Sequence, residues 1–436
     1  MNIILLSGGS GKRLWPLSND IRSKQFIKFL HRPDGELESM VQRIFRQIKT
    51  VDPGASVTIA TAKSQASAIQ NQLGTDVSIS VEPCRRDTFA AIALATAFLK
   101  DCKGVGEDEP VAVCPVDPYV EVDYFRCVKK MINEVGGNDK NLVLMGIEPT
   151  YPSEKYGYIV PTVNGEGRGY DFTEKPDKQT AEEYIRKGAL WNGGVFAYKL
   201  KYVLQKAQEL LGTSSYSELY HNYDRFEKIS FDYAVVEAEK SIEVVRYNGT
   251  WKDLGTWNTL TEAMEEPVIG DSRLNETCAN THVVNELGIP ILVMGGKNLV
   301  VAASPEGILV SDKEQSSYIK PFVDVIDQQV MFAEKSWGSY RVLEVEEDSL
   351  TVKVTLNPGH KMNYHSHEKR DEIWNVIAGE GKAVVDGREF EVKVGDIINL
   401  PVGCKHTVIA GEFGLKLIEV QLGKEITVSD KHKYTL

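Results

Sequence analysis

The sequence predicts an α/β protein in three parts: a doubly wound domain at residues 1–265, a small all-β connector at 266–334 and a β-barrel at 335–436. Three patterns carry this prediction. Short apolar runs alternate with helical segments over roughly the first 150 residues, as in a parallel sheet covered by helices on both faces. Short strand candidates separated by Gly, Asn and Pro then follow. From about residue 335, strands alternate with tight glycine turns, which is typical of a barrel.

The composition is that of an ordinary globular protein. Hydrophobic residues make up 42% of the 436 residues, charged residues make up 26%, and the net charge is −12. A negative net charge disfavours binding to nucleic acid or to an anionic membrane. The 6 cysteines form no Cys-x-x-Cys pair, the first apolar run is too short for a signal peptide, and no apolar stretch approaches a membrane span. We therefore expect a cytoplasmic protein with reduced thiols.

The N-terminal domain reads as a series of strand–helix units. The expected strands are Ile3–Leu6, Val57–Ala60, Val77–Ser80, Val111–Cys114 and Leu142–Gly146, and the expected helices are Leu37–Lys49, Ser64–Leu73, Thr88–Lys100 and Asp123–Val135. Thr88 and Asp123 have side chains suited to cap their helices. Ligands of an open sheet of this kind bind beyond the carboxyl ends of its strands, so the loops there are the first candidates for a site.

The connector and the barrel are predicted from shorter strands. In the connector these are 283–284, Ile289–Met294, Leu299–Ala302 and Gly307–Val310, which together suggest a few β-helix-like coils. In the barrel they are Leu350–Leu356, Ile373–Ala378, Lys382–Val385, Glu389–Val394, Asp396–Leu400 and Leu415–Gln421. The Asp-Gly pair at 386–387 is a hairpin signal.

The loop after the first strand has the features of an anion site. Gly8, Gly9 and Gly11 let backbone N–H groups approach a phosphate with no Cβ in the way, and Arg13 and Lys24 add fixed positive charge. On the glycines alone, a plain turn between a strand and a helix explains the loop equally well. The loop is not a P-loop, because its Gly-Lys pair is followed by Arg13 and not by Ser or Thr, and it lacks the third glycine of a dinucleotide fingerprint.

The order of residues from Ser7 to Ser18 resembles the Gly-Gly-x-Gly-x-Arg-Leu-x-Pro-Leu signature of sugar-phosphate nucleotidylyltransferases. Its fuller form resembles the mannose-1-phosphate guanylyltransferases in particular. The resemblance implies a Rossmann-like fold in which this loop, with its glycines and Arg13, holds the nucleoside triphosphate. Lys24 matches the lysine of the family's Pro-Lys pair, and Ser23 stands where the family has the proline.

Two aspartates match further motifs of this family. Asp117 follows the strand Val111–Cys114 in a Pro-x-Asp segment, although Pro118 replaces the family's next residue, a histidine, and Asp253 lies in Trp-x-Asp-x-Gly-x-Trp. Each alone would pass for an ordinary loop acid. A sugar phosphate is already an anion, so nucleotidyl transfer to it needs no protein nucleophile, and catalysis must come from positioning and charge neutralisation. The resemblance implies that Asp117 and Asp253 hold the catalytic Mg²⁺.

The remaining motifs extend the resemblance over about residues 1–265. They are a guanine-side segment, a Phe-x-Glu-Lys-Pro segment beside the sugar phosphate and a Trp-Asn-x-Gly segment beside the sugar. Asp87 replaces the family's usual asparagine, and an aspartate cannot donate as an amide does. The implied nucleotide contacts are Gly8, Gly9, Gly11, Arg13, Glu82, Arg86, Asp87 and Thr88, the implied sugar-phosphate contacts are Gly157, Glu174, Lys175 and Asn192, and the implied catalytic groups are Arg13, Lys24, Asp117, Lys175 and Asp253.

The barrel carries a set of candidate metal ligands. His365 and His367 alternate on one strand, so both imidazoles point to the same face, and Glu372 and His406 come from later strands. Three nitrogens and one carboxylate suit Zn²⁺, Mn²⁺, Fe²⁺ or Ni²⁺, of which we expect Zn²⁺. The spacing of these residues and their neighbouring glycines resembles both cupin motifs, except that Ala410 replaces the terminal asparagine of the second.

A guanylyltransferase followed by a cupin resembles the bifunctional enzymes that also interconvert mannose 6-phosphate and fructose 6-phosphate. Their metal-side segment begins with Gln, where this chain has His365, and it contains an arginine that Arg370 matches. The chain is also shorter than most such enzymes. The resemblance therefore implies the fold and the metal more directly than the isomerase activity, for which Arg370 would contact the sugar phosphate.

These observations favour a GTP:α-D-mannose-1-phosphate guanylyltransferase that makes GDP-mannose for a surface polysaccharide with Mg²⁺ as cofactor. Two alternatives stay open: the same reaction with another nucleoside triphosphate and sugar 1-phosphate, and a non-catalytic sensor of sugar nucleotides. The sequence predicts no nucleic-acid or membrane partner. It leaves the oligomeric state open, and a homodimer is one assembly that it allows.

Overall fold

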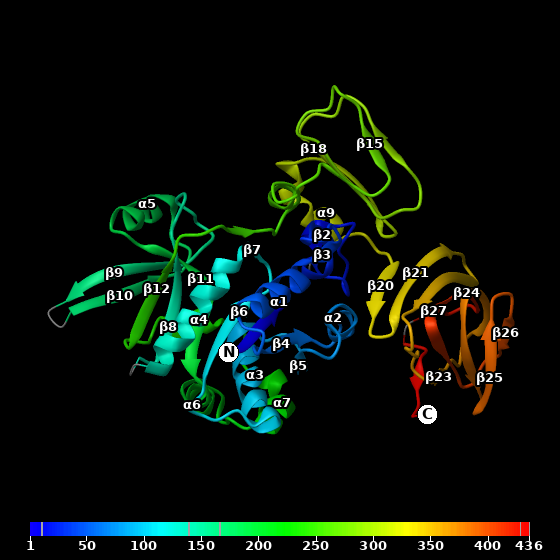
Figure 1. The fold of residues 1–436 in the computed structure, drawn as a ribbon, viewed down its shortest axis with the longest axis horizontal. Coiled ribbons are helices and arrows are strands. Elements are labelled where there is room, and N and C mark those ends of the chain that lie inside the picture. The colour runs from blue at the N-terminus through cyan, green and yellow to red at the C-terminus, as the bar shows by residue number, and fades with distance from the viewer. Residues whose placement is uncertain (10–11, 138–139, 165–166, 428, 436) are drawn as a thin grey trace.

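The computed structural model describes residues 1–9, 12–137, 140–164, 167–427 and 429–435. The chain forms three bodies in sequence order: a mixed sheet with helices on both faces, a narrow connector of stacked strands, and a barrel (Figure 1). The barrel lies to one side of the first body, where its first strand contacts α2 (Ala66–Leu73). Among the described residues, no helix is long and apolar enough to cross a bilayer.

The sheet of the first body has nine strands in the described part of the chain. They are β1 (Asn2–Ser7), β4 (Ser56–Ala62), β5 (Ser78–Glu82), β6 (Pro110–Pro115), β8 (Leu142–Ile147), β9 (Tyr158–Asn164), β10 (Gly167–Thr173), β11 (Leu190–Lys199) and β12 (Ile242–Tyr247). β1 lies between β4 and β6 and is parallel to both. β11 is antiparallel to β6 and β8, so the sheet is mixed. An apolar run does not encode strand direction, and the sequence pattern therefore missed this reversal.

Helices cover both faces of this sheet, as the alternating pattern predicts. One hydrophobic core receives α1 (Met40–Val51), α2 and α4 (Val122–Gly137), and a second core on the opposite face receives α3 (Asp87–Lys103), α6 (Leu200–Leu211) and α7 (Tyr216–His221). Residues 89–97 of α3 are all buried, because the many alanines of this helix let it lie close to the sheet. α5 (Lys178–Arg186) adds Ala181 to the first core, and α8 (Trp257–Thr261) packs in a separate hydrophobic cluster.

The predicted helix starts differ from the observed ones. α1 begins at Met40, because the three residues before it form β3 (Leu37–Ser39) and pair with β2 (Lys28–His31). Thr88 lies inside α3, where its hydroxyl accepts a hydrogen bond from the backbone N–H of Phe231 at 2.8 Å, so its predicted role as a cap is wrong. The predicted cap at Asp123 is also wrong, since this residue lies within the first turn of α4.

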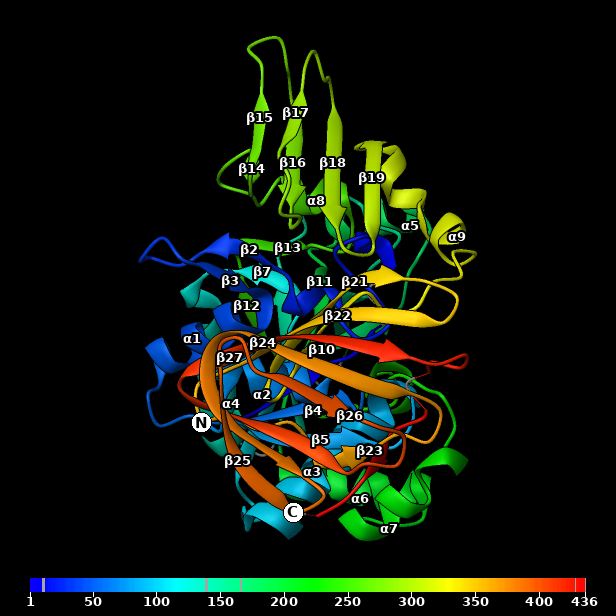
Figure 2. The ribbon, with the colours of Figure 1, turned by 90° about the vertical axis from the view of Figure 1, so that its right-hand side faces the viewer.

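The connector consists of strands that stack in register. They are β14 (Val268–Ile269), β15 (Ser272–Leu274), β16 (His282–Asn285), β17 (Ile291–Val293), β18 (Leu299–Ser304) and β19 (Gly307–Asp312). β14, β16 and β18 are parallel neighbours, and β15 is parallel to β17, which confirms the predicted β-helix-like coils (Figure 2). Antiparallel β19 ends the stack and leads to a 3-10 helix, η5 (Gln315–Tyr318), and to α9 (Lys320–Val323).

The barrel is a curled antiparallel sheet, as predicted. Its strands are β20 (Phe332–Lys335), β21 (Gly338–Val345), β22 (Ser349–Leu356), β23 (His365–Ser366), β24 (Asp371–Val385), β25 (Arg388–Lys393), β26 (Ile397–Leu400), β27 (His406–Leu422) and β28 (His432–Lys433). The two strands predicted before the hairpin are one bent strand, β24, which pairs with β27 across two irregularities. A Cβ on Gly379 would lie 2.1 Å from the carbonyl oxygen of Gly414, so the bend requires glycine there.

A polar junction joins the three bodies behind the glycine-rich loop. The buried Glu306 of the connector accepts hydrogen bonds from the Asn19 side chain at 2.8 Å and from the backbone N–H groups of Met331 and Phe332 at 2.9 and 3.0 Å. Arg22 forms two hydrogen bonds to Glu286, at 2.6 and 2.8 Å. The residues that follow the loop are therefore held by both the connector and the start of the barrel.

Candidate active site and metal centre

The glycine-rich loop lies beside a cleft of about 290 Å³ at the carboxyl ends of β1 and β6. The loop and the short 3-10 helix after it, η1 (Lys12–Leu14), supply one side of its lining. The structure brings together in this cleft the predicted residues Gly8, Gly9, Arg13, Lys24, Asp117 and Asp253. Gly11, also predicted to contact the nucleotide, lies outside the described residues.

A buried hydrogen-bond network holds this loop in place. Gly9 adopts a left-handed φ of 99°, which favours glycine, and its carbonyl accepts hydrogen bonds from Ser23 Oγ at 3.1 Å and Gln65 Nε2 at 3.2 Å. Gln65 Nε2 also donates to Ser23 Oγ at 2.7 Å. Ser23, which departs from the family's proline, thus anchors the loop. The sequence pattern missed Gln65, since nothing in its neighbourhood marks it.

Lys24 joins the two predicted aspartates in a three-residue ion-pair group. Its Nζ lies 3.0 Å from Asp117 Oδ2 and 3.2 Å from Asp253 Oδ1. Two very short strands, β7 (Pro118–Val120) and β13 (Trp251–Asp253), pair antiparallel, and this register sets Asp253 opposite Pro118. Aspartates that are far apart in the sequence therefore meet at one edge of the cleft.

The two aspartates favour the charged form of Lys24. Burial of Lys24 opposes its charge, but the attraction of Asp117 and then of Asp253 outweighs the burial, so the pKa of Lys24 lies above its usual value. The carboxyl side chains of Asp117 and Asp253 are 45% and 46% exposed. Two accessible carboxylates beside the cleft are the hard oxygen ligands that Mg²⁺ prefers, so the residues present fit this ion.

A second pocket of about 240 Å³ shares Asp117 and Asp253 with the cleft. Gly157, Glu174 and Asn192, which the sequence assigns to the sugar phosphate, line this pocket together with Lys155, Tyr156, Asp232 and Trp251. A Cβ on Gly157 would lie 2.4 Å from Glu174 Oε2, so only glycine fits here without a shift of that carboxylate. The structure thus brings three of the four predicted sugar-side residues into one pocket.

Two side-chain contacts organise this pocket. Asn192 Nδ2 donates a hydrogen bond to Asp232 Oδ1 at 2.6 Å. Burial raises the pKa of Asp232 to about 6, against a usual value of 3.8, and the bond from Asn192 only partly offsets this effect. Lys175, the fourth predicted residue, has its Nζ 2.7 Å from Glu174 Oε1 and a φ of 45°. Lys175 is not among the described residues that line the second pocket, but it contacts Glu174, which does.

The four residues predicted on the guanine side are engaged elsewhere. Glu82 accepts a hydrogen bond from Tyr223 Oη at 2.8 Å, and Arg86 Nε donates to the backbone carbonyl of Asp224 at 3.1 Å. Asp87 Oδ1 accepts from the backbone N–H of Thr88 at 2.7 Å. In the described part of the chain, none of Glu82, Arg86, Asp87 and Thr88 is among the residues that line the cleft or the sugar pocket. Their role in binding a base stays a prediction.

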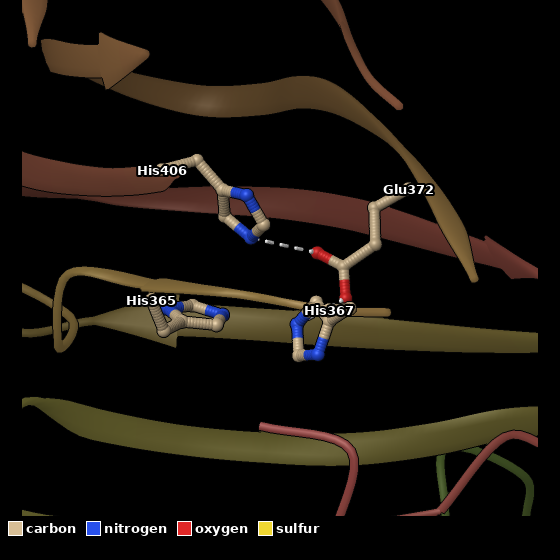
Figure 3. Close-up of side chains that lie close together, drawn as sticks. All are labelled: His365, His367, Glu372 and His406. Atoms are coloured by element: carbon tan, nitrogen blue, oxygen red, sulfur yellow. Dashed lines mark ion pairs between the residues drawn. The ribbon is translucent and has the colours of Figure 1, made fainter. Parts of the chain in front are cut away.

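The predicted metal ligands meet inside the barrel (Figure 3). One ligand atom from each of His365, His367, Glu372 and His406 can be chosen so that all lie within 4.8 Å of one another, and all four side chains are buried. Glu372 Oε1 lies 3.0 Å from His367 Nε2, and Glu372 Oε2 lies 3.3 Å from His406 Nε2. β23, β24 and β27 supply His365, Glu372 and His406, whereas His367 directly follows the end of β23, so the prediction that both histidines lie on one strand is wrong for His367. β23 pairs with β27 through His365 and His406 themselves.

The orientation of the imidazoles tests whether this cluster fits a metal. The Nδ1 atoms of His365, His367 and His406 each lie within hydrogen-bond distance of a backbone carbonyl oxygen. This arrangement places the proton on Nδ1 and the lone pair on Nε2 of each ring, as in most histidine–metal sites, although the Nε2 of His367 also lies within hydrogen-bond distance of Arg370. His406 Nε2 and Glu372 Oε2 are buried and make no hydrogen bond among the described residues. The four residues therefore fit a divalent transition metal.

Burial changes the pKa of a histidine in this cluster. Burial lowers the pKa of His365 to about 2, so its imidazole stays neutral, as a metal ligand requires. Arg370 is buried, and its Nε donates to Glu372 Oε1 at 3.0 Å while its Nη2 lies 3.1 Å from His367 Nε2. Arg370, predicted to contact a sugar phosphate, is thus tied to two of the ligands, and its predicted role stays untested.

Two further titratable groups near the cluster were missed by the sequence analysis. Glu419 is buried on β27, where burial and then repulsion from Glu372 raise its pKa to about 7. Burial lowers the pKa of Lys431 to about 8, and attraction from Glu419 partly offsets this. Glu419 follows Leu415 and Leu417 at alternate positions of a predicted strand, so the inward alternation was a usable signal. Lys431 carried no such signal.

Comparisons with known proteins agree with this geometry. Residues 2–267 match the family described as nucleotidyl transferase, and residues 326–434 match the mannose-6-phosphate isomerase C-terminal family. A mannose-1-phosphate guanylyltransferase of Salmonella montevideo is 27% identical over 98% of this chain and 97% of its own length. The xanthan biosynthesis protein XanB of Xanthomonas campestris pv. campestris (strain B100) is 28% identical over 98% of this chain and 96% of its own.

Among solved structures, the crystal structure of a mannose-1-phosphate geranyltransferase from Thermus thermophilus is similar, with a TM-score of 0.61 and 28% sequence identity. The similarity covers 74% of this chain and 98% of the other chain. Its extent is larger than the nucleotidyl transferase match alone, so it reaches beyond the first body of the fold.

Proposed function

Because the chain belongs to the nucleotidyl transferase family, we propose that it is a GTP:α-D-mannose-1-phosphate guanylyltransferase that forms GDP-mannose and pyrophosphate. The observation that carries this proposal is the position of Asp117 and Asp253, which line both the phosphate cleft and the sugar pocket. Joining a sugar phosphate to a nucleoside triphosphate calls for charge-neutralising groups at the boundary between the two substrates. The names of the relatives support guanosine and mannose as the substrates.

In the proposed reaction, a phosphate oxygen of mannose 1-phosphate attacks the α-phosphorus of GTP, and the bond from that phosphorus to the pyrophosphate oxygen breaks. The attacking oxygen is already anionic, so no side chain has to remove a proton. Arg13, Lys24 and the backbone N–H groups of Gly8 and Gly9 bind the phosphates and hold the α-phosphorus in line. When bound at Asp117 and Asp253, Mg²⁺ would neutralise the charge that develops on the departing pyrophosphate.

The sugar pocket accounts for the second substrate. Asn192 and Asp232 offer a fixed donor and acceptor pair for sugar hydroxyls, and Glu174 offers a further acceptor. Lys175 is a point charge next to this pocket and is the residue that we assign to the phosphate of the sugar. The base-binding roles of Glu82, Arg86, Asp87 and Thr88 are part of the same proposal, with support from their motif alone.

Pyrophosphate release tests the proposal directly. The full-length protein is assayed with each of the four common nucleoside triphosphates against a panel of sugar 1-phosphates, with Mg²⁺ present. We expect GTP with mannose 1-phosphate to give the highest kcat/KM. Faster turnover of another pair would support the same reaction with different substrates. If no combination releases pyrophosphate above the rate without protein, the protein is a non-catalytic sensor of sugar nucleotides.

A second candidate function belongs to the barrel. We propose that His365, His367, Glu372 and His406 bind one divalent transition metal ion, of which Zn²⁺ is the best fit to the ligand set. The buried pair of Glu419 and Lys431 close to this cluster favours an isomerase, because moving a proton between neighbouring carbons needs an acid and a base. Interconversion of mannose 6-phosphate and fructose 6-phosphate after loading with Zn²⁺ or Co²⁺, and its loss in Arg370→Ala, is the expected result.

A further inference from the structure

A lysine of the connector lies in the lining of the phosphate cleft. Lys320 is the first residue of α9, and it lines the same cleft as Gly8, Gly9, Arg13 and Lys24. The connector therefore contributes directly to a site whose other described lining residues all come from the first body. No motif marks Lys320, because its position depends on how the two bodies pack.

The packing of α9 against the first body is apolar and fixed. Ile319 directly precedes Lys320, and Val323 lies three residues after it. Both are buried in one hydrophobic cluster with Leu14 and Leu17, which follow the glycine-rich loop. These apolar contacts hold α9 close to the loop, and Lys320, at the start of this helix, lies in the lining of the cleft. An isolated surface lysine would have no such support.

An ion-pair network links Lys320 to the loop. Asp324 lies one turn after Lys320, with Asp324 Oδ2 4.0 Å from Lys320 Nζ and Asp324 Oδ1 3.5 Å from Lys12 Nζ. Lys12 also lies 3.6 Å from Asp20. One carboxylate of the connector thus orients two lysines, one from each body, at the same edge of the cleft.

The other two lysines of the cleft are already paired with aspartates, so a nucleotide needs a further positive charge. Lys24 is shared between Asp117 and Asp253, and Lys12 is shared between Asp20 and Asp324. A triphosphate carries several negative charges, which Arg13 and these two shared lysines do not balance. The Lys320 side chain is 56% exposed, and its Nζ lies 4.0 Å from Asp324 Oδ2, which is a weak ion pair. Its ammonium group can therefore turn to an incoming anion at little cost in free energy.

On these grounds we propose that Lys320 binds the outer phosphates of the nucleoside triphosphate and the pyrophosphate product, so that the connector completes the nucleotide site. This inference rests on the proposed nucleotidyl transfer. It assigns Lys320 to the nucleotide and not to the sugar phosphate, because Lys320 lines the cleft on the loop side and is not among the described residues that line the sugar pocket.

The test compares Lys320→Ala, Lys320→Gln and Lys320→Arg with wild type, all as full-length proteins. Lys297→Ala is the matched control, since Lys297 is an exposed lysine of the same connector that does not line the cleft. We expect KM for GTP to rise about tenfold in the Ala and Gln variants, with KM for mannose 1-phosphate within about twofold of wild type. The Arg variant should restore most of the affinity, and the control should match wild type.

Calorimetric titration with magnesium pyrophosphate reads the same site without turnover. We expect its dissociation constant to rise about tenfold in Lys320→Ala. Unchanged pyrophosphate affinity, or an equal rise in KM for both substrates, would overturn the inference, as would a wild-type protein that binds no pyrophosphate. A wild-type protein that binds pyrophosphate through Lys320 but transfers no nucleotide would overturn the proposed function and leave this inference standing.

Discussion

Lys24, Asp117 and Asp253 act as one electrostatic unit, and removing one charge should disable it. Asp117→Asn or Asp253→Asn is expected to lower kcat at least about a hundredfold, because charge neutralisation is the main catalytic contribution in a site of this kind. Since both carboxylates are almost half exposed, the loss in stability should stay below about 1 kcal/mol. Steady-state kinetics at saturating Mg²⁺, with Tm measured alongside, check both values.

The exposed Asp76→Asn is the control for these two variants. It removes one negative charge from the same body but is not among the described residues that line the cleft, and it should turn over at the wild-type rate. A variant at Asp117 or Asp253 with near-normal kcat at limiting Mg²⁺ would remove that residue from the site.

Asp232 makes the free energy of unfolding of the protein depend on pH. Its pKa is raised to about 6 in the folded protein, so the fold favours the neutral acid. The stabilisation of the fold by the neutral Asp232 side chain is fully present below about pH 4 and is lost as the pH rises through 6. Relative to wild type, Asp232→Asn should gain at most about 3 kcal/mol of unfolding free energy between pH 4 and pH 8. Urea unfolding at pH 4, 6 and 8 measures this, and a constant difference between the two proteins would contradict it.

Motif reading placed individual residues better than it placed their partners. Gly8, Arg13, Asp117 and Asn192 were assigned to a cleft or pocket from local spacing, and the structure brings each of them there. Ser23, which holds the loop through Gly9, was seen only as a departure from a proline. Side chains that act through contacts distant in the sequence leave no local pattern, so such roles could not be predicted.

At the scale of elements, the long strands were predictable and the short ones were not. β1, β4 and β6 were recognised from apolar runs, because a strand buried on both faces needs several consecutive apolar residues. β7 and β13 have three residues each, too few for any periodicity, yet their pairing is what sets Asp117 beside Lys24 and Asp253. The sequence predicted that Asp117 lies at the edge of the sheet, but it did not predict that Asp117 and Asp253 lie on either side of Lys24.

The position of Glu372 on β24, inside the histidine cluster, predicts that its carboxylate binds the metal. Glu372→Gln keeps the shape of the β24 side chain but removes the anionic ligand, and it should weaken Zn²⁺ binding more than about tenfold. Glu391→Gln is the control, because this exposed residue of the neighbouring β25 points away from the cluster. Competition with a chromophoric chelator measures the affinities. Equal affinity in Glu372→Gln and wild type would exclude Glu372 as a ligand.

At the scale of the whole molecule, the metal cluster and the phosphate cleft belong to different bodies. The four ligands lie on β24, on β27 and at the end of β23, with His367 directly after that strand, whereas the cleft is lined by the first body and α9. Stripping the full-length protein of transition metals with a chelator and then restoring Mg²⁺ should therefore leave nucleotidyl transfer within about twofold of its original rate. Transfer that returned only with Zn²⁺ would show that the barrel controls the cleft.

Cutting the chain after residue 330 is a poorer test of that independence. The cut would remove the Met331 and Phe332 N–H groups that donate to Glu306, and it would leave a buried carboxylate with the Asn19 side chain alone among these three donors. Unsatisfied buried polar groups cost about 1–3 kcal/mol each. The sequence predicted three parts, but a junction made by single side chains far apart in the sequence leaves no trace in composition or periodicity.

The ammonium group of Lys24 gives the resting protein its own counter-ion. It stands between Asp117 and Asp253, so in the absence of substrate the charge of the two carboxylates is already partly offset. A free divalent ion gains little from them until an incoming phosphate draws Lys24 away. Metal and nucleotide should then arrive as one complex: titrated Mg²⁺ or Mn²⁺ should bind the resting protein at least about tenfold more weakly than in the presence of a non-hydrolysable nucleotide, and Lys24→Met should abolish that difference.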